Sequence, residues 1–231
     1  SPLVPSLNFS SAFSYDSEEE LIHYHLDKFE SHRYLRDSSP LVQQNEKIFQ
    51  KINNGQSLLF SSGMKAVWSV LWATLENVDT YVTFGAFYRK TQVNLDEICR
   101  KCSKSHNNFS SVEEGLKNLK SDKNLLFFLE SPSNPFLNVL DISLIRETFP
   151  NSIIVYDNTL AGLLNDKIDL SICDYVVGSC TKYIGGHNDV IGGLVTTFSD
   201  ESYQKVWAVR SAQGGIMDQM SAYLLFRSLK T

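Results

Sequence analysis

One lysine, Lys182, stands in a segment whose composition suits covalent chemistry. It lies in the run Ser179-Cys180-Thr181-Lys182-Tyr183-Ile184-Gly185-Gly186-His187, directly after the mostly apolar residues 175–178. Most lysines are solvated surface charges, but hydroxyl side chains stand one and three positions before this one, and two glycines follow shortly after it. This arrangement suits an amine that forms a Schiff base, with hydroxyls nearby to hold a phosphate.

Short apolar runs alternate with segments of helical periodicity along the chain. Predicted strands cover residues 57–60, 79–83, 125–129, 153–156, 174–177 and 192–198, and predicted helices cover residues 41–52, 64–75, 92–102, 112–119 and 143–149. This order predicts an α/β fold with a mostly parallel sheet flanked by helices. In such folds ligands bind beyond the carboxyl ends of the strands, so the residues that follow each strand are candidates for a site.

Two further predicted strands end in polar turns. Residues 61–64 read Ser61-Ser62-Gly63-Met64 and open a helix, where free N–H groups and the helix dipole attract an anion. An ordinary serine N-cap is the more common meaning of that turn taken alone. Residues 130–135 read Glu130-Ser131-Pro132-Ser133-Asn134-Pro135, which suits either a polar aromatic ligand or a plain loop.

Asp157 follows the strand at 153–156 and begins the run Asp157-Asn158-Thr159. An acid at the end of a buried strand needs a partner, which could be a protonated pyridine nitrogen, an arginine or a metal. A metal would need more ligands than the sequence offers nearby. A lysine, a phosphate-binding turn, a polar loop and a buried acid at four strand ends together predict a site for pyridoxal 5'-phosphate.

Composition limits the other possibilities. The 231 residues are 42% hydrophobic, with four cysteines and a formal net charge of −5. The sequence therefore predicts a globular protein that binds neither nucleic acid nor membrane, in the reducing cytoplasm. Cys99 and Cys102 form a CxxC with no second pair, so no metal site is predicted.

The motifs together resemble the Cys/Met-metabolism (transsulfuration) group of fold-type-I (aspartate aminotransferase-like) pyridoxal-phosphate enzymes. That group includes cystathionine γ-synthase, the cystathionine lyases and methionine γ-lyase. The resemblance runs from about Tyr34 to the last residue, and it rests on Tyr34-x-Arg36 with Pro40, on the four runs given above, and on Arg227-x-Leu229-Lys230-Thr231.

The resemblance implies a role for each matching residue. Lys182 would carry the aldimine and shuttle protons, Asp157 would pair with the pyridinium nitrogen, and Thr159 is a further cofactor-binding residue. The remaining roles are phosphate binding by the Gly63 and Met64 backbone with Ser179 and Thr181, a place near the ring hydroxyl for Asn134, and contact with a neighbouring subunit's phosphate by Tyr34 and Arg36. A homo-oligomer with shared active sites, a dimer or a homotetramer, is therefore expected.

One stretch departs from the family pattern. Where the family has Tyr-Gly-x-Thr, with the tyrosine stacked on the cofactor ring, this chain has Phe84-Gly85-Ala86-Phe87-Tyr88. Phe84 is expected to keep the stacking face without the hydroxyl, and Tyr88 is a candidate to reach in instead. Loss of one general acid–base group costs about 100- to 10,000-fold in rate.

Two domains are expected: an extended arm over residues 1–40 and a cofactor-binding domain over residues 41–231. A predicted helix capped by Asp218 reaches Thr231 without a terminator, so either a fragment or a truncated relative, without the family's C-terminal domain, is expected. The predicted function is β- or γ-elimination, or γ-replacement, on cystathionine, a homoserine ester or a related amino acid. The alternative is a catalytically impaired or regulatory relative. An aminotransferase or decarboxylase of the same broad fold fits the motifs less well.

Overall fold

The computed structural model describes residues 4–26, 32–119, 124–165 and 168–231. A seven-stranded sheet in the order β1-β7-β6-β5-β4-β2-β3 forms its centre. The strands are β1 (Gln56–Phe60), β2 (Thr80–Phe84), β3 (Ser105–Phe109), β4 (Leu125–Glu130), β5 (Ile153–Asp157), β6 (Tyr175–Ser179) and β7 (Gly193–Thr197). Only β7 runs antiparallel to its neighbours, so the predicted mostly parallel sheet is confirmed.

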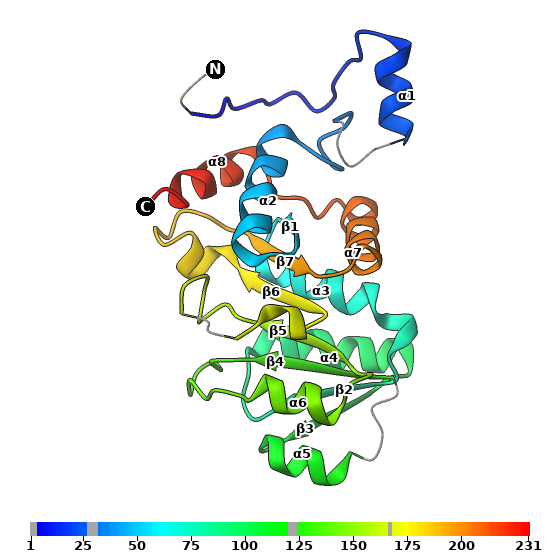
Figure 1. Ribbon diagram of the computed structural model, residues 1–231, viewed down its shortest axis with the longest axis vertical. Helices are drawn as coiled ribbons and strands as arrows, with labels where there is room; N and C mark the ends of the chain where they lie inside the picture. Colours follow the sequence, from blue (N-terminus) through cyan, green and yellow to red (C-terminus); the bar gives the residue numbers. More distant parts are fainter. Residues whose placement is uncertain (1–3, 27–31, 120–123, 166–167) are drawn as a thin grey trace.

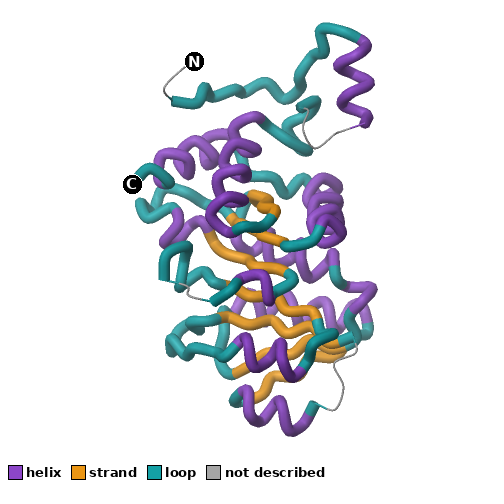
Figure 2. Tube along the Cα trace, in the orientation of Figure 1, coloured by secondary structure: helices purple, strands orange, loops and turns teal. Residues whose placement is uncertain are grey.

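Helices cover both faces of this sheet (Figures 1 and 2). The α-helices are α1 (Glu18–Leu26), α2 (Pro40–Asn53), α3 (Gly63–Ala73), α4 (Arg89–Cys102), α5 (Val112–Asn118), α6 (Ile142–Thr148), α7 (Asp200–Gln213) and α8 (Gln219–Ser228). Short helical turns are η1 (Leu75–Asn77), η2 (Leu170–Ile172) and η3 (Cys180–Ile184). Helices α3, α4 and α7 pack on one face, and α5 and α6 pack on the other.

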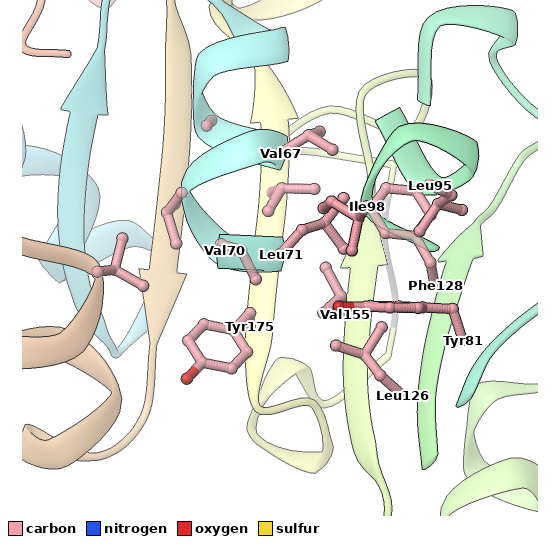
Figure 3. Packing of buried hydrophobic residues seen from close by; sticks show 14 of the residues in the cluster. Val67, Val70, Leu71, Tyr81, Leu95, Ile98, Leu126, Phe128, Val155 and Tyr175 are labelled. Carbon is pink, nitrogen blue, oxygen red and sulfur yellow. The ribbon is translucent and has the colours of Figure 1, made fainter. Parts of the chain in front are cut away.

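The alternation of side chains along each strand divides the core between the two faces. In β4, Leu126 and Phe128 point toward α3 and α4, while Phe127 and Leu129 point toward α5 and α6. Figure 3 shows the first of these clusters, with Leu71 of α3 and Ile98 of α4 above the strands. Because the period is two residues, the last residue of each strand is assigned to a face by its position alone.

Most of the described N-terminal segment lies outside the sheet, although Leu7 packs against the cluster that contains Leu59 and Leu194. Figure 1 shows the segment before α2, with α1, extending beyond the end of the sheet that carries α2 and α7. No residue of α1 is buried. The predicted arm over residues 1–40 remains an expectation, and its residues 1–3 and 27–31 lie outside the described part of the chain.

Strand β3 was not predicted. Its residues Ser105–Phe109 read Ser-His-Asn-Asn-Phe, and none of them is buried. It pairs only with β2 and forms one edge of the sheet. An edge strand that carries polar side chains lacks the apolar run by which the buried strands were found.

Candidate functional site

The ends of four parallel strands and the start of one helix enclose a cavity of about 260 Å³. It is lined by Ser62, Gly63, Met64, Val67, Tyr88, Glu130, Asn134, Asp157, Thr159, Leu160, Gly178, Ser179, Thr181 and Lys182. Eight of the eleven site residues predicted from the sequence lie here: Lys182, Asp157, Thr159, Gly63, Met64, Ser179, Thr181 and Asn134. The structure therefore brings the four predicted strand ends to one place.

Lys182 reaches the cavity from η3, the turn that continues β6. Its backbone leaves the helical conformation at φ −93° and ψ −119°. Two hydrogen bonds hold the residues around it: the N–H of Gly186 donates to the carbonyl of Lys182 (2.8 Å), and the N–H of Gly192 donates to Thr181 Oγ1 (3.1 Å). The amine is thus presented from a turn that is hydrogen-bonded to the chain leading into β7.

The N-terminus of α3 forms the anion-binding side of the cavity. Ser62 is the N-cap, and its hydroxyl accepts the N–H of Lys65 at 3.1 Å. Gly63 lies against β6 so closely that a Cβ atom on it would be 2.9 Å from the Cβ of Ser179. A glycine is needed for this close approach, which leaves the first turn of α3 beside the Ser179 hydroxyl.

Asp157 is the buried acid of the site, with 7% of its surface exposed. Its Oδ1 accepts hydrogen bonds from the backbone N–H (3.0 Å) and the hydroxyl (2.6 Å) of Thr159, and that hydroxyl accepts the N–H of Ser179 (2.9 Å). Burial raises the pKa of Asp157, and the bonds from Thr159 oppose that rise. A cation inside the cavity would relieve the cost of burying this carboxyl group.

Glu130 is a second buried acid, which lies in one of the predicted polar turns but is not among the predicted site residues. Its Oε2 accepts the N–H of Tyr88 and its Oε1 accepts the N–H of Asn134, both at 2.7 Å. Burial and the nearby Asp157 raise the pKa of Glu130 to about 7, against the lowering effect of these two bonds. Glu130 lies opposite Asp157 in the pairing of β4 with β5, and only this strand register could have revealed that the two acids are neighbours.

The expectation that Phe84 faces the cofactor is wrong. Phe84 is the last residue of β2 and, like Val82, belongs to the cluster on the α5 and α6 face. Its ring stacks on Phe127, with centroids 6.1 Å apart, and it does not line the cavity. Tyr88, four residues later, lines the cavity instead. The two-residue period of the strand places Phe84 on the far face.

Tyr34 and Arg36 do not line the cavity of their own chain. The Arg36 guanidinium lies 5.2 Å from the Tyr34 ring centroid, and it forms an ion pair with Asp37 (3.6 Å). Asp37 in turn accepts a hydrogen bond from Ser211 of α7. Their predicted role toward a neighbouring subunit therefore remains a prediction.

The remaining features concern metal binding, the cysteine pair and membrane insertion. Within the described ranges, no group of three or more histidine, cysteine, aspartate or glutamate side chains is placed to hold a metal ion. Cys99 and Cys102 are free thiols in the last turn of α4. None of the helices described is long and apolar enough to cross a membrane.

A lysine, a buried carboxyl group and a helix N-terminus at the carboxyl ends of parallel strands define a pyridoxal-phosphate-binding α/β protein. The residues fit this cofactor for two reasons. Asp157 is a buried acid that a protonated ring nitrogen would stabilise, and Gly63 leaves the N-terminus of α3 accessible beside Ser179. Residues 2–231 match the family described as Cys/Met metabolism PLP-dependent enzyme. The chain belongs to this family.

Its relatives carry several activities. The chain is 30% identical over 233 residues to cystathionine γ-synthase 1, chloroplastic, of Nicotiana tabacum, covering 99% of this chain and 43% of the relative. It is 31% identical over 230 residues to L-methionine γ-lyase of Fusobacterium nucleatum subsp. nucleatum, covering 96% of this chain and 58% of the relative. The chain thus spans about half the length of these curated relatives.

Solved structures share the fold. The crystal structure of metB from Corynebacterium glutamicum aligns with a TM-score of 0.87 at 28% identity, over 100% of this chain and 59% of that chain. Cystathionine γ-synthase of Xanthomonas oryzae pv. oryzae, in complex with cystathionine, aligns with a TM-score of 0.85 at 27% identity, over 99% and 58%.

Proposed function

We propose that this chain binds pyridoxal 5'-phosphate in the cavity between β4, β5, β6 and α3, and that the protein acts on sulfur-containing or γ-substituted amino acids. The reaction is β- or γ-elimination, or γ-replacement, and cystathionine and homoserine esters are the candidate substrates. One observation carries the proposal: the Lys182 side chain, the buried Asp157 and the N-terminus of α3 line a single cavity. The names of the relatives support this substrate class.

The bound cofactor would supply an aldehyde that captures an amine and a pyridine ring that accepts electrons from the substrate carbon. Lys182 would bind that aldehyde through Nζ and move a proton at the substrate α-carbon. Asp157 would hold the proton on the ring nitrogen. The Thr159 hydroxyl orients the Asp157 carboxyl group by donating a hydrogen bond to its Oδ1 (2.6 Å).

The remaining residues would position the cofactor. The N–H groups of Gly63 and Met64, with the hydroxyls of Ser179 and Thr181, would bind the phosphate at the start of α3. Asn134 would lie near the ring hydroxyl.

A second copy of the chain would complete the site. Tyr34 is 44% exposed, and half of the Arg36 side chain is exposed, on a segment outside the cavity of the same chain. In a dimer or a tetramer of dimers these residues would bind a neighbouring subunit's phosphate. A cytoplasmic location remains a prediction from the sequence.

Reconstitution with pyridoxal 5'-phosphate tests the cofactor site. The wild-type protein should gain a visible absorbance band, and Lys182→Ala should abolish it because no other cavity-lining residue carries a primary amine. Lys101→Ala is the matched control, since Lys101 pairs with Glu97 on α4 at 2.7 Å. A wild-type protein that stays colourless with the cofactor would overturn the proposal.

A regulatory or catalytically impaired relative is the second candidate. The sequence suggested it because Phe84 lacks a hydroxyl, but Phe84 packs away from the cavity and Tyr88 lines it, so that missing hydroxyl does not bear on the site. The full-length gene product should be assayed for α-keto acid release from cystathionine, cysteine and methionine. A visible band without turnover of any γ- or β-substituted amino acid would identify the regulatory candidate.

A further inference from the structure

One carboxyl group joins two loops of the cavity wall. Glu130 ends β4, and its oxygens accept the backbone N–H groups of Tyr88 and Asn134 at 2.7 Å each. Tyr88 follows β2 and Asn134 follows β4, so the two loops come from different strands. Both residues line the cavity. Glu130 is thus the shared hydrogen-bond acceptor of both loops.

The chemistry of this position favours a carboxylate over its isosteres. An ionised carboxyl group offers acceptors at both oxygens, whereas a glutamine side chain of the same size turns one end into a donor. Here both partners are N–H donors, so glutamine would place an NH₂ group against one of them. A buried N–H without an acceptor loses its hydrogen bond to water and gains none in the protein. One of the two loops would therefore lose its attachment.

Resting on the proposed function, we propose that Glu130 is a positioning residue for the cofactor, which holds the Tyr88 side chain and Asn134 against the pyridine ring. Phe84 is turned to the far face of the sheet. Tyr88 is the aromatic side chain in the cavity lining, so its placement decides how the ring is covered. The N–H bond to Glu130 fixes the start of the turn that carries Tyr88 into α4.

Cofactor titration separates this role from a purely structural one. Apo wild type and Glu130→Gln should be titrated with pyridoxal 5'-phosphate while the visible band is recorded. Glu130→Gln should still form the band, because Lys182 is intact, but with a dissociation constant raised by about tenfold, as loss of one charge-assisted bond allows. Glu130→Asp retains both acceptors and should restore part of the affinity. Unchanged affinity in a folded Glu130→Gln protein would overturn the proposal.

Glu114→Gln is the matched control. Glu114 also accepts a backbone N–H, that of Ser110 at 2.8 Å, but it lies on α5 and does not line the cavity. Its substitution should leave the dissociation constant of the cofactor unchanged. An equal loss of affinity in both variants would indicate general destabilisation and would contradict the positioning role.

A double-mutant cycle tests the link to Tyr88. If Glu130 acts by placing the Tyr88 ring, then Glu130→Gln should cost less affinity in a Tyr88→Ala background, where there is no ring to place. Strict additivity of the two substitutions would contradict that link, because a purely structural Glu130 would weaken binding independently of the ring.

Hydrogen exchange in the wild type tests the proposal even if the Glu130→Gln protein does not fold. The amides of Tyr88 and Asn134 should be protected from hydrogen exchange, and cofactor binding should increase that protection. Rapid exchange of both amides in the cofactor-bound protein would overturn the proposal. Failure of the proposed function has a different signature, since the wild type would then form no visible band at all.

Discussion

Glu130 and Asp157 end two neighbouring strands and lie directly opposite each other in the register of β4 and β5. Both are 7% exposed. Burial, with Asp157 as a second cause, raises the pKa of Glu130 from its ordinary value of 4.5 to about 7. Two adjacent acids at the floor of one cavity resist simultaneous ionisation until a cation enters.

The stability of the apo protein should therefore depend on this pair. Glu130 holds its proton more tightly in the folded chain than in the unfolded chain, so its contribution is present below the unfolded pKa and is lost as the pH rises through the folded pKa. The contribution of Glu130 to the free energy of unfolding should therefore decrease as the pH rises from about 4.5 to about 7. Urea unfolding at several pH values would measure this.

Glu130→Gln isolates the effect, because glutamine does not titrate. Asp157, whose pKa burial also raises, changes stability in the same direction, whereas burial lowers the pKa of His106 and acts in the opposite direction. Lys182 and Tyr88 line the same cavity and are common to both proteins. The difference between the two curves should therefore report the titration of Glu130 together with its coupling to Asp157, and parallel curves would refute the assignment.

Asp157→Asn should stabilise the protein without cofactor and reduce the stabilisation that the cofactor gives. Asparagine keeps an oxygen for Thr159 but removes a buried acid without a cationic partner, so the free energy of unfolding should rise by about 1–3 kcal/mol at pH 8. Cofactor should then stabilise wild type more than the variant, because binding to the folded state is linked to stability. Thermal unfolding with and without cofactor measures both effects; an apo variant less stable than wild type would contradict the expectation.

Gly63→Ala should damage phosphate binding. The added Cβ would lie 2.9 Å from the Cβ of Ser179, so α3 or β6 must shift, at a cost of about 1–3 kcal/mol. Because the helix terminus moves, affinity for pyridoxal 5'-phosphate should fall more than affinity for pyridoxal, which has no phosphate. Equal losses for the two ligands would argue against a phosphate site at α3.

Phe84→Tyr should not improve catalysis. The Phe84 ring packs against Phe127 and Phe109 on the face opposite the cavity, so a new hydroxyl would be buried among apolar side chains. The expected result is a loss of about 1–3 kcal/mol in stability with an unchanged cofactor dissociation constant. Phe84→Ala should cost about 3–5 kcal/mol, because it removes buried apolar atoms and leaves a cavity in the same cluster. Weaker cofactor binding in a stable Phe84 variant would place the ring in the cavity after all.

Phe84 and Glu130 mark the limits of prediction from sequence. The strand runs and their polar ends could be predicted, because burial on both faces leaves continuous apolar segments. The face on which Phe84 lies could be predicted by counting along β2 in steps of two residues, since Val82 and Phe84 share one side of that strand. The hydrogen bonds of Glu130 could not be predicted, because they depend on the placement of two loops and on strand register.

Mixed oligomers would test whether Tyr34 and Arg36 serve a neighbouring subunit. Lys182→Ala and Arg36→Ala proteins should each be inactive or weak, because one lacks the amine and the other a phosphate contact. In a dimer formed at random from equal amounts of both, about a quarter of the sites would combine Lys182 of one chain with Arg36 of the other. Activity of the refolded mixture should therefore recover to about that fraction, as measured by α-keto acid release. A mixture no more active than the mean of its components would show that Arg36 serves its own chain or no phosphate at all.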